Sequence, residues 1–229
     1  MIKDAIKKIP VLGVVLQKIY HVVIGKSKFT SSSDYWEKRY RKGGNSGVGS
    51  YDQLAEFKAE VLNQFVEEKK VASVIEFGCG DGNQLNYFHF NSYIGFDVSP
   101  TAIDRCRSIY RMDNTKRFEM VTAYKGEKAD LVLSLDVIYH LVENEVYHEY
   151  MQQLFAASEK YVIIYSSNQE VPDTNGIADH VRHRKFTDWV EAYAPDFKLI
   201  QHIPNKYSPA VKGMISSFAD FYIFQMKNG

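Results

Sequence analysis

The chain has no excess of charge of either sign and very little cysteine. Lysine and arginine together number 28, as do aspartate and glutamate, so the formal net charge is +0. Proteins that hold nucleic acid usually carry a basic excess, and the balance argues against that role. The two cysteines, Cys79 and Cys106, have no metal-ligand spacing between them. A reducing cytosol fits better than a disulfide-stabilised exterior, so we expect a cytoplasmic protein without a metal site.

The sequence also lacks an uninterrupted apolar stretch of bilayer length. The first 29 residues come nearest, but Pro10, Gln17, Lys18 and His21 interrupt them, and lysines flank the apolar centre. Residues 1–30 are therefore interpreted as a basic amphipathic segment. Residues 1–29 either lie on the anionic inner face of the cytoplasmic membrane, or pack on the core or on a second subunit.

Residues 31–229 are expected to form one α/β domain. Apolar runs predict strands over residues 72–77, 92–97, 117–123, 130–136 and 161–167. Helices are expected at 85–90, from Pro100, over 143–159 and over 186–193. Near-continuous apolar strands, each followed by a helix, indicate a parallel sheet covered on both faces. Residues 197–203 and 217–226 follow without a helix between them, so they should pair as a hairpin. The predicted fold is a doubly wound, mostly parallel seven-stranded sheet with an antiparallel C-terminal strand.

Residues 34–50 precede this sheet and are predicted to form a lid. They begin as a short aromatic and basic helix and then run into a loop with four glycines, at positions 43, 44, 47 and 49. As a lid, the segment would line the site with Tyr35, Trp36, Arg39 and Tyr40, and the glycines would let it open. The alternative is a surface helix with a flexible linker. Ser50 and Gln53 predict a capping box for the next helix.

The stretch "VIEFGCGDGNQL", residues 74–85, joins an apolar run to three glycines at alternate positions, Gly78, Gly80 and Gly82. In doubly wound folds, ligands lie beyond the carboxyl ends of the strands, where the strand order reverses. The turn is therefore placed for a nucleotide-like cofactor. Asp97, at the end of the second strand, is placed to accept hydrogen bonds from both ribose hydroxyls, which suits dinucleotide and adenosyl cofactors alike.

Three features favour an adenosyl cofactor. The glycines follow the spacing G-x-G-x-G, whereas the pyrophosphate fingerprint is G-x-G-x-x-G. Glu76 and Asp81 place two carboxylates where they would repel a pyrophosphate but suit an ammonium and a sulfonium. The expected terminal hairpin is also foreign to ordinary dinucleotide domains. An NAD-dependent oxidoreductase is therefore a remote alternative.

"EFGCGDG", "YIGFDVS" and "ADLVLSLDVIYHL" stand in the expected order, and over residues 50–226 the chain resembles the class I S-adenosylmethionine-dependent methyltransferases. The resemblance implies S-adenosyl-L-methionine as cofactor, with Asp97 at the ribose and Ala123 with Tyr124 near the adenine. The full set of implied cofactor contacts is Glu76, Gly78, Cys79, Gly80, Gly82, Asp97, Val98, Ala123, Leu135 and Asp136. "TAYKGEK" offers no acidic residue directly after the third strand, where many relatives carry one.

Two histidines are candidates for the base that removes a proton from the acceptor. His140 lies just past the fourth strand, and a histidine with a pKa near neutrality suits this task. The alternative is that His140 caps or hydrogen-bonds the loop. Asp136 either orients His140, contacts the cofactor ammonium or caps the turn. "DHVRHRKF" follows the fifth strand and holds His180, Arg182, His183 and Arg184. These residues either receive an anionic acceptor, with His183 as a second base, or form a solvated surface.

"DVIYHL", "VIIYSSN" and "HVRHRKFTDWV" are similar to segments of bacterial methyltransferases of surface-glycan and secondary-metabolite assembly. The resemblance implies O-methylation of a saccharide or its phosphate, on a lipid-linked carrier if the N-terminal segment binds membrane. The alternatives are a small-molecule N- or O-methyltransferase, and a non-catalytic protein that binds the adenosyl cofactor. The Asn/Asp-Pro-Pro-Tyr/Phe motif is absent, as is an aromatic and basic stripe, so no nucleic-acid partner is expected.

Overall fold

The computed structural model describes residues 29–171, 178–207 and 215–227. Contacts within the chain divide it into two units, Met1–Thr30 and Ser31–Gly229, and the fold below is that of the second unit. The amphipathic segment expected over residues 1–30 lies, up to residue 28, outside the described residues. Across the described ranges, no helix combines the length and the apolar character that crossing a membrane requires.

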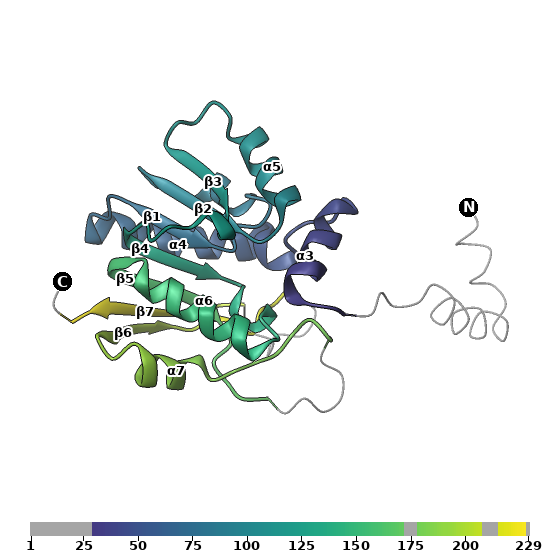
Figure 1. Ribbon diagram of the computed structural model, residues 1–229. Coiled ribbons are helices and arrows are strands. Elements are labelled where there is room, and N and C mark those ends of the chain that lie inside the picture. Colours follow the sequence, from purple (N-terminus) through teal and green to yellow (C-terminus); the bar gives the residue numbers. More distant parts are fainter. Residues whose placement is uncertain (1–28, 172–177, 208–214, 228–229) are drawn as a thin grey trace. The chain divides into compact units, whose positions relative to one another are not determined.

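Seven strands form one sheet in the order β3-β2-β1-β4-β5-β7-β6 (Figure 1). Neighbouring strands from β3 to β5 pair in parallel, whereas β7 pairs antiparallel with both β5 and β6. The predicted fold class, including the reversed C-terminal strand, is confirmed. The strands are β1 (Val74–Phe77), β2 (Tyr93–Asp97), β3 (Lys116–Met120), β4 (Ala129–Leu135), β5 (Ser158–Ser166), β6 (Phe197–Ile203) and β7 (Asp220–Met226).

Helices cover both faces of the sheet because successive strand residues point to opposite sides. Val74 of β1 packs in a cluster with residues of α4 and α5, whereas its neighbour Ile75 packs in a second cluster with residues of α6 and α7. Figure 1 shows α3 beyond the ends of the strands, on the side to which the arrow of β4 points. The helices are α3 (Ser32–Arg41), α4 (Asp52–Lys69), α5 (Pro100–Ile109), α6 (Asn144–Ala156) and α7 (Phe186–Tyr193).

Of the two predicted helix caps, one is confirmed and the other is wrong. Ser99 caps α5, accepting a hydrogen bond from Ala102 N, as predicted. The capping box at Ser50 is wrong, because α4 begins at Asp52 without a side-chain cap and Ser50 belongs to a short 3-10 turn, η1 (Val48–Ser50). The helix expected after the glycine turn is likewise only a 3-10 turn, η2 (Gln84–Tyr87).

The side chain of Asn63 explains why η2 ends early. Its Nδ2 donates to Tyr87 O and its Oδ1 accepts from His89 N, both at 2.9 Å. The Asn63 side chain thus bonds the backbone of this segment as a neighbouring strand would. Phe88, the residue after η2, is extended and buried. The helix expected to reach residue 159 also ends sooner, at Ala156, because β5 begins at Ser158.

Candidate active site

A cavity of about 160 Å³ lies at the carboxyl ends of the central strands. This is where the strand order reverses between β1 and β4, the usual ligand position in open α/β sheets. Its wall is built from the turn after β1, the end of β2, the end of β4 and helix α3. The residues that line it include Trp36, Tyr40, Gly78, Cys79, Gly80, Gln84, Asp97, Val98, Val121, Leu135, Asp136, His140 and Glu143.

The turn after β1 requires glycine for two physical reasons. Gly78, Gly80 and Gly82 have φ angles of 87°, 58° and 75°, in the left-handed region that other residues rarely adopt. A Cβ atom on Gly78 would lie 2.4 Å from Val137 Cγ2, and one on Gly80 would lie 2.4 Å from Ser46 Oγ. The chain therefore keeps bare backbone against the cavity, and the lid loop packs directly onto it.

Asp97 links the end of β2 to the glycine turn. Its Oδ2 accepts from Gly80 N at 2.9 Å, and its Oδ1 accepts from Ser99 N at 2.8 Å. Each carboxylate oxygen has a second lone pair, so Asp97 can still accept hydrogen bonds from a ligand's hydroxyl groups. Burial raises the pKa of Asp97 to about 6.

Three buried side-chain oxygens within the described residues have no hydrogen-bond partner: Glu76 Oε1, Gln84 Oε1 and Ser166 Oγ. Glu76 lies in β1, Gln84 in the η2 turn and Ser166 at the end of β5. Glu76 Oε2 accepts from Tyr93 OH at 2.5 Å, and burial raises the pKa of Glu76 to about 7. Orphaned acceptors are costly in a buried site. Of the three residues only Gln84 lines the cavity, so its oxygen fits a ligand that brings donors, such as an ammonium group.

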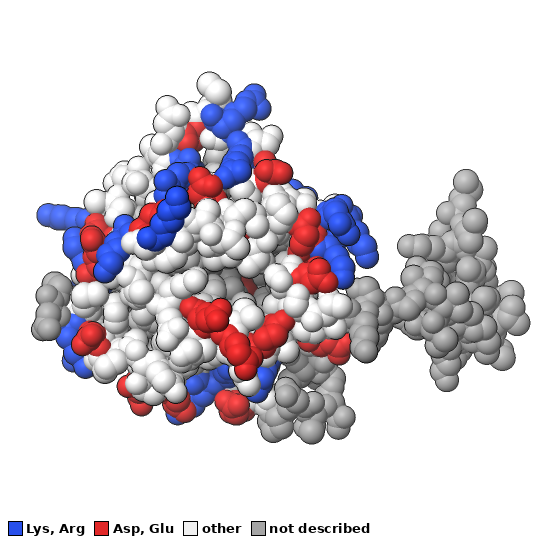
Figure 2. Space-filling model, viewed as in Figure 1, with Lys and Arg blue, Asp and Glu red and all other residues white. Residues whose placement is uncertain are grey.

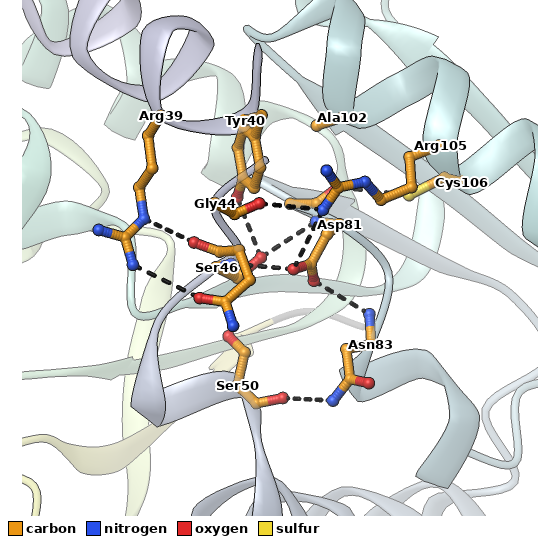
Figure 3. Close-up of polar contacts among 12 residues, drawn as sticks. Arg39, Tyr40, Gly44, Ser46, Ser50, Asp81, Asn83, Ala102, Arg105 and Cys106 are labelled. Carbon is orange, nitrogen blue, oxygen red and sulfur yellow. Dashed lines mark hydrogen bonds and ion pairs between the residues drawn. The ribbon is translucent and has the colours of Figure 1, made fainter. Parts of the chain in front are cut away.

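Asp81 fastens the lid loop to the glycine turn (Figure 3). Its Oδ2 accepts from Ser46 N at 2.9 Å and from Tyr51 OH at 2.8 Å, while its own N donates to Ser46 Oγ at 3.0 Å. Arg105 NH1 adds a bond to Gly44 O at 3.1 Å. The expectation that Asp81 faces the cofactor is corrected, because its carboxylate is occupied by the lid and lies outside the cavity lining.

Helix α3 is held over the cavity by two glutamates. Glu143 accepts from Ser32 N at 2.9 Å and from Ser32 Oγ at 2.5 Å. Glu37 accepts from Ser99 Oγ at 2.6 Å and from Thr101 Oγ1 at 2.8 Å. Trp36, Tyr40, Ser46 and Ser50 of residues 34–50 line the cavity, and the action of this segment as a lid stays a prediction.

The four lid residues expected to contact the acceptor divide into two pairs. Trp36 and Tyr40 line the cavity. Tyr35 lies outside the lining and stacks on His180, with ring centres 4.1 Å apart. Arg39 also lies outside it, donating from Nε to Asn45 O at 2.6 Å.

His140 lies in the cavity wall in a defined orientation. Its Nδ1 lies 3.0 Å from His180 O. A carbonyl oxygen only accepts, so Nδ1 carries the proton and Nε2 keeps its lone pair. The Trp36 ring meets the imidazole edge-on at 4.9 Å. Burial lowers the pKa of His140 to about 4, so the imidazole is neutral at physiological pH.

Asp136 follows β4 and contacts His140 only indirectly. Its Oδ2 lies 2.5 Å from Lys58 Nζ, and its Oδ1 accepts from Tyr139 OH at 2.8 Å. Its φ of 60° is left-handed, which is uncommon for a residue other than glycine. The carboxylate lines the cavity as expected, but both oxygens already have partners.

The basic loop after β5 braces the site from outside. Arg184 NH1 donates to Leu141 O at 2.6 Å, and Arg182 NH1 donates to Val142 O at 3.3 Å and to Asn144 Oδ1 at 3.0 Å. These groups lie outside the cavity lining, so the expected anion-binding role is corrected: the guanidinium groups support the segment that carries His140.

The second candidate base, His183, also lies outside the cavity lining. Its Nδ1 lies 2.6 Å from Ser167 Oγ. The structure therefore brings His140, and not His183, to the ligand cavity.

Most of the expected cofactor contacts meet at the cavity, and a few do not. Gly78, Cys79, Gly80, Asp97, Val98, Leu135 and Asp136 line it. Glu76 and Gly82 lie behind the turn, and Val121 takes the place expected for Ala123. Gln84, Ser46, Ser50 and Glu143 also line the cavity and were not predicted to do so. Gln84 directly follows the glycine motif, and Ser46 and Ser50 lie within residues 34–50, so these three carried a signal by position.

Charge is distributed unevenly on the face shown in Figure 2: acidic side chains gather over α6, and basic ones over α5 and β3. The exposed acids of α6 are Glu145 and Glu149.

Within the described ranges, no three His, Cys, Asp or Glu side chains group as metal ligands would.

The sequence matches the model of a protein family described as a methyltransferase domain over residues 51–210. No curated protein sequence matches the chain.

Solved structures show a similar fold. One is the magnesium protoporphyrin IX methyltransferase ChlM of Synechocystis PCC 6803 with bound S-adenosylhomocysteine (SAH): TM-score 0.58, 16% identity, covering 85% of this chain and 97% of that one. Another is the N-methyltransferase NodS of Bradyrhizobium japonicum WM9 in complex with S-adenosyl-L-homocysteine: TM-score 0.63, 12% identity, covering 86% and 99%. At these identities the likeness concerns the fold alone.

Proposed function

Since this chain belongs to the family of methyltransferase domains, we propose that it methylates a hydroxyl group of a saccharide with His140 as general base. The chain is a class I methyltransferase with S-adenosyl-L-methionine as its cofactor, and its resemblance to that class is confirmed. When bound, this cofactor supplies an activated methyl group on a sulfonium. One observation carries the proposal: the neutral imidazole of His140 lines the same cavity as the glycine turn and Asp97.

The residues present fit this cofactor. Asp97 keeps free lone pairs for the ribose hydroxyls. Gln84 lines the cavity and offers an unpartnered oxygen beside the bare backbone of the glycine turn, which suits the ammonium of the methionine part. The resemblance adds the unpartnered oxygen of Glu76, which lies outside the lining. Val98 and Val121 supply apolar surface at the ends of β2 and β3, where the adenine would lie.

His140 supplies what a hydroxyl acceptor needs. A hydroxyl is a poor nucleophile until its proton is removed. The unprotonated Nε2 accepts this proton, while the Nδ1 hydrogen bond to His180 O holds the ring and stabilises the imidazolium that forms. The low pKa keeps Nε2 unprotonated at neutral pH but makes it a weaker base than an imidazole with a pKa near neutrality. Trp36 and Tyr40 shield the site from water.

An uncharged saccharide fits the surroundings of His140 better than a sugar phosphate does. The guanidinium groups of Arg182 and Arg184 are engaged with carbonyl oxygens. Glu143 lines the cavity with a carboxylate, which would repel a phosphate. The Trp36 ring lines the cavity 4.9 Å from the imidazole and provides apolar surface next to the base, against which a sugar ring can pack.

The test is methyl transfer from labelled S-adenosyl-L-methionine to soluble and lipid-linked glycans, with soluble amines as the competing substrates. Label in a glycan, in an alkali-stable ether linkage, is the expected result. Label confined to amines would reject O-methylation and support the alternative of a small-molecule N-methyltransferase. A preference for the lipid-linked glycan would support a cytoplasmic enzyme held at the membrane by residues 1–29.

A non-catalytic binding protein is distinguished by the His140→Ala variant. We expect this variant to bind S-adenosylhomocysteine as the wild type does and to transfer no methyl group. If the wild-type protein binds S-adenosylhomocysteine and methylates none of these acceptors, the proposed function is wrong.

A further inference from the structure

A fully buried lysine lies behind the wall of the active site. Lys58, on α4, has no exposed side-chain surface, and its Nζ lies 2.5 Å from Asp136 Oδ2. The same ammonium lies 5.0 Å from the ring centre of Tyr165, in a cation–π arrangement. Removing an ammonium from water is unfavourable without a counter-charge. Lys58 and Asp136 therefore depend on one another.

Asp136 is also held in a strained backbone conformation. A left-handed φ of 60° is uncommon for a residue other than glycine, although aspartate adopts it more readily than most. Such a conformation persists only where the surroundings impose it, and it is found preferentially at functional sites. Here the Lys58 ammonium holds one carboxylate oxygen, the Tyr139 hydroxyl holds the other, and Asp136 N donates to Tyr165 O at 3.0 Å.

The lid reaches the same carboxylate. A Cβ atom on Gly49 would lie 2.8 Å from Asp136 Oδ2, so only glycine lets the lid loop approach this closely. The ion pair thus lies where α4, the end of β4 and the lid meet.

Tyr139 links the Lys58–Asp136 ion pair to His140, because it contacts both Asp136 and His140. It follows Asp136 by one turn and directly precedes His140, and the two rings lie 4.5 Å apart. We propose that Lys58 is a positioning residue for methyl transfer: it holds Asp136 in the left-handed turn and thereby fixes Tyr139 and the orientation of His140. This inference rests on the proposed function, in which His140 is the base.

The electrostatics of His140 provide a readout that a purely structural role would leave unchanged. The charged and titratable groups that act on its imidazole are His180, Asp136 and Arg39. Asp136 favours the imidazolium. We expect the Lys58 ammonium, which lies 2.5 Å from the Asp136 carboxylate, to offset that influence in the wild type. Without this ammonium, the uncompensated carboxylate raises the pKa of His140 above its value of about 4.

The experiment is an NMR titration of the His140 imidazole in the full-length Lys58→Gln variant, without cofactor or acceptor. Glutamine is neutral and keeps an amide donor for Asp136. We expect the pKa of His140 to rise by roughly half a unit to one unit, and the ring to populate both neutral tautomers instead of the Nδ1-protonated form alone. A folded variant with the wild-type titration and a single tautomer would overturn the proposal.

The matched control is Lys206→Gln. Lys206 pairs at 2.5 Å with Glu60, which lies on α4, the helix that carries Lys58. Both side chains of this pair are exposed. This variant should keep the wild-type titration of His140; a rise equal to that of Lys58→Gln would overturn the proposal, since any lost positive charge would then suffice.

If Lys58→Gln does not fold, Tyr139→Phe decides, because it removes only the hydroxyl that bonds Asp136. Mixed tautomers of His140 support the proposal, and a single wild-type tautomer contradicts it. These measurements need no methyl transfer. A wild-type protein that methylates nothing would therefore reject the proposed function, while the imidazole titration would still decide the role of Lys58.

Discussion

The two halves of the site are built by different routes along the chain. In the cofactor half, the glycine turn and Asp97 belong to consecutive strands, and Gly80 bonds Asp97 across 17 residues. In the acceptor half, the Ser32–Glu143 contact spans 111 residues, and the bond from His140 to His180 spans 40. A cofactor common to many enzymes is thus bound by a compact motif, whereas the acceptor site depends on contacts between distant segments.

Burial affects the two halves with opposite chemical results. In the cofactor half it raises the pKa of Glu76 to about 7 and that of Asp97 to about 6. In the acceptor half it lowers the pKa of His140 to about 4. Both shifts favour the neutral form of each group. Burial thus disfavours the charged carboxylate forms of Glu76 and Asp97, and it leaves the imidazole of His140 unprotonated.

The largest expected effect is in the acceptor half. His140→Ala should lower kcat by roughly 10²–10⁴-fold, the usual contribution of a general base. The affinity for S-adenosylhomocysteine should stay at the wild-type value, because Asp97 and the glycine turn are unchanged. Steady-state kinetics together with calorimetry measure both. Equal losses of kcat and of affinity would show that the two halves are not separable in this way.

The next effect concerns Glu76 and the pH dependence of stability. The folded-state pKa of about 7 lies above the ordinary value of 4.5, so the folded protein binds more protons in that window. The free energy of unfolding should therefore fall as the pH rises from 4.5 through 7. Glu76→Gln should remove this dependence and be more stable at pH 8, by up to about 3 kcal/mol.

The same variant should bind the cofactor less well, because the orphaned oxygen then carries no charge for the ammonium. Urea unfolding between pH 4 and 8 and calorimetry with S-adenosyl-L-methionine test this pair of results. A variant that keeps both the wild-type pH dependence and the wild-type affinity would exclude Glu76 from the cofactor half.

A smaller effect comes from the backbone of the glycine turn. Gly80→Ala combines an unfavourable φ of 58° with a Cβ atom 2.4 Å from Ser46 Oγ. Overpacking of this kind costs about 2 kcal/mol, which corresponds to roughly thirtyfold in cofactor affinity if the lid is displaced. The control is Gly126→Ala, with a φ of 95° and no atom within 4 Å of the added Cβ. Equal affinities for the two variants would show that the close approach of the lid is unimportant.

The contrast between the halves explains what the sequence revealed. The alternation of apolar strands and helices predicted the sheet, because burial on both faces leaves a pattern in consecutive residues. The glycine motif and Asp97 were likewise readable, since positive φ and a strand-end carboxylate are local requirements. The helix over residues 186–193 was predicted at its observed bounds.

The remaining features depend on contacts that no local pattern encodes. Arg184 appeared to belong to an anion site, yet the structure turns it toward the carbonyl of Leu141. Asp81 appeared to face the cofactor, yet the lid occupies it. No sequence pattern singled out Lys58, and only the structure shows it buried against Asp136.

The most direct measurement is calorimetric titration of S-adenosylhomocysteine into the full-length protein and into its Asp97→Ala variant. One molecule should bind per wild-type chain, and the variant should lose roughly ten- to a hundredfold in affinity, as expected for hydrogen bonds to a charged acceptor. Absence of binding to the wild type, or equal affinity for both proteins, would contradict the assignment of this cavity to the cofactor.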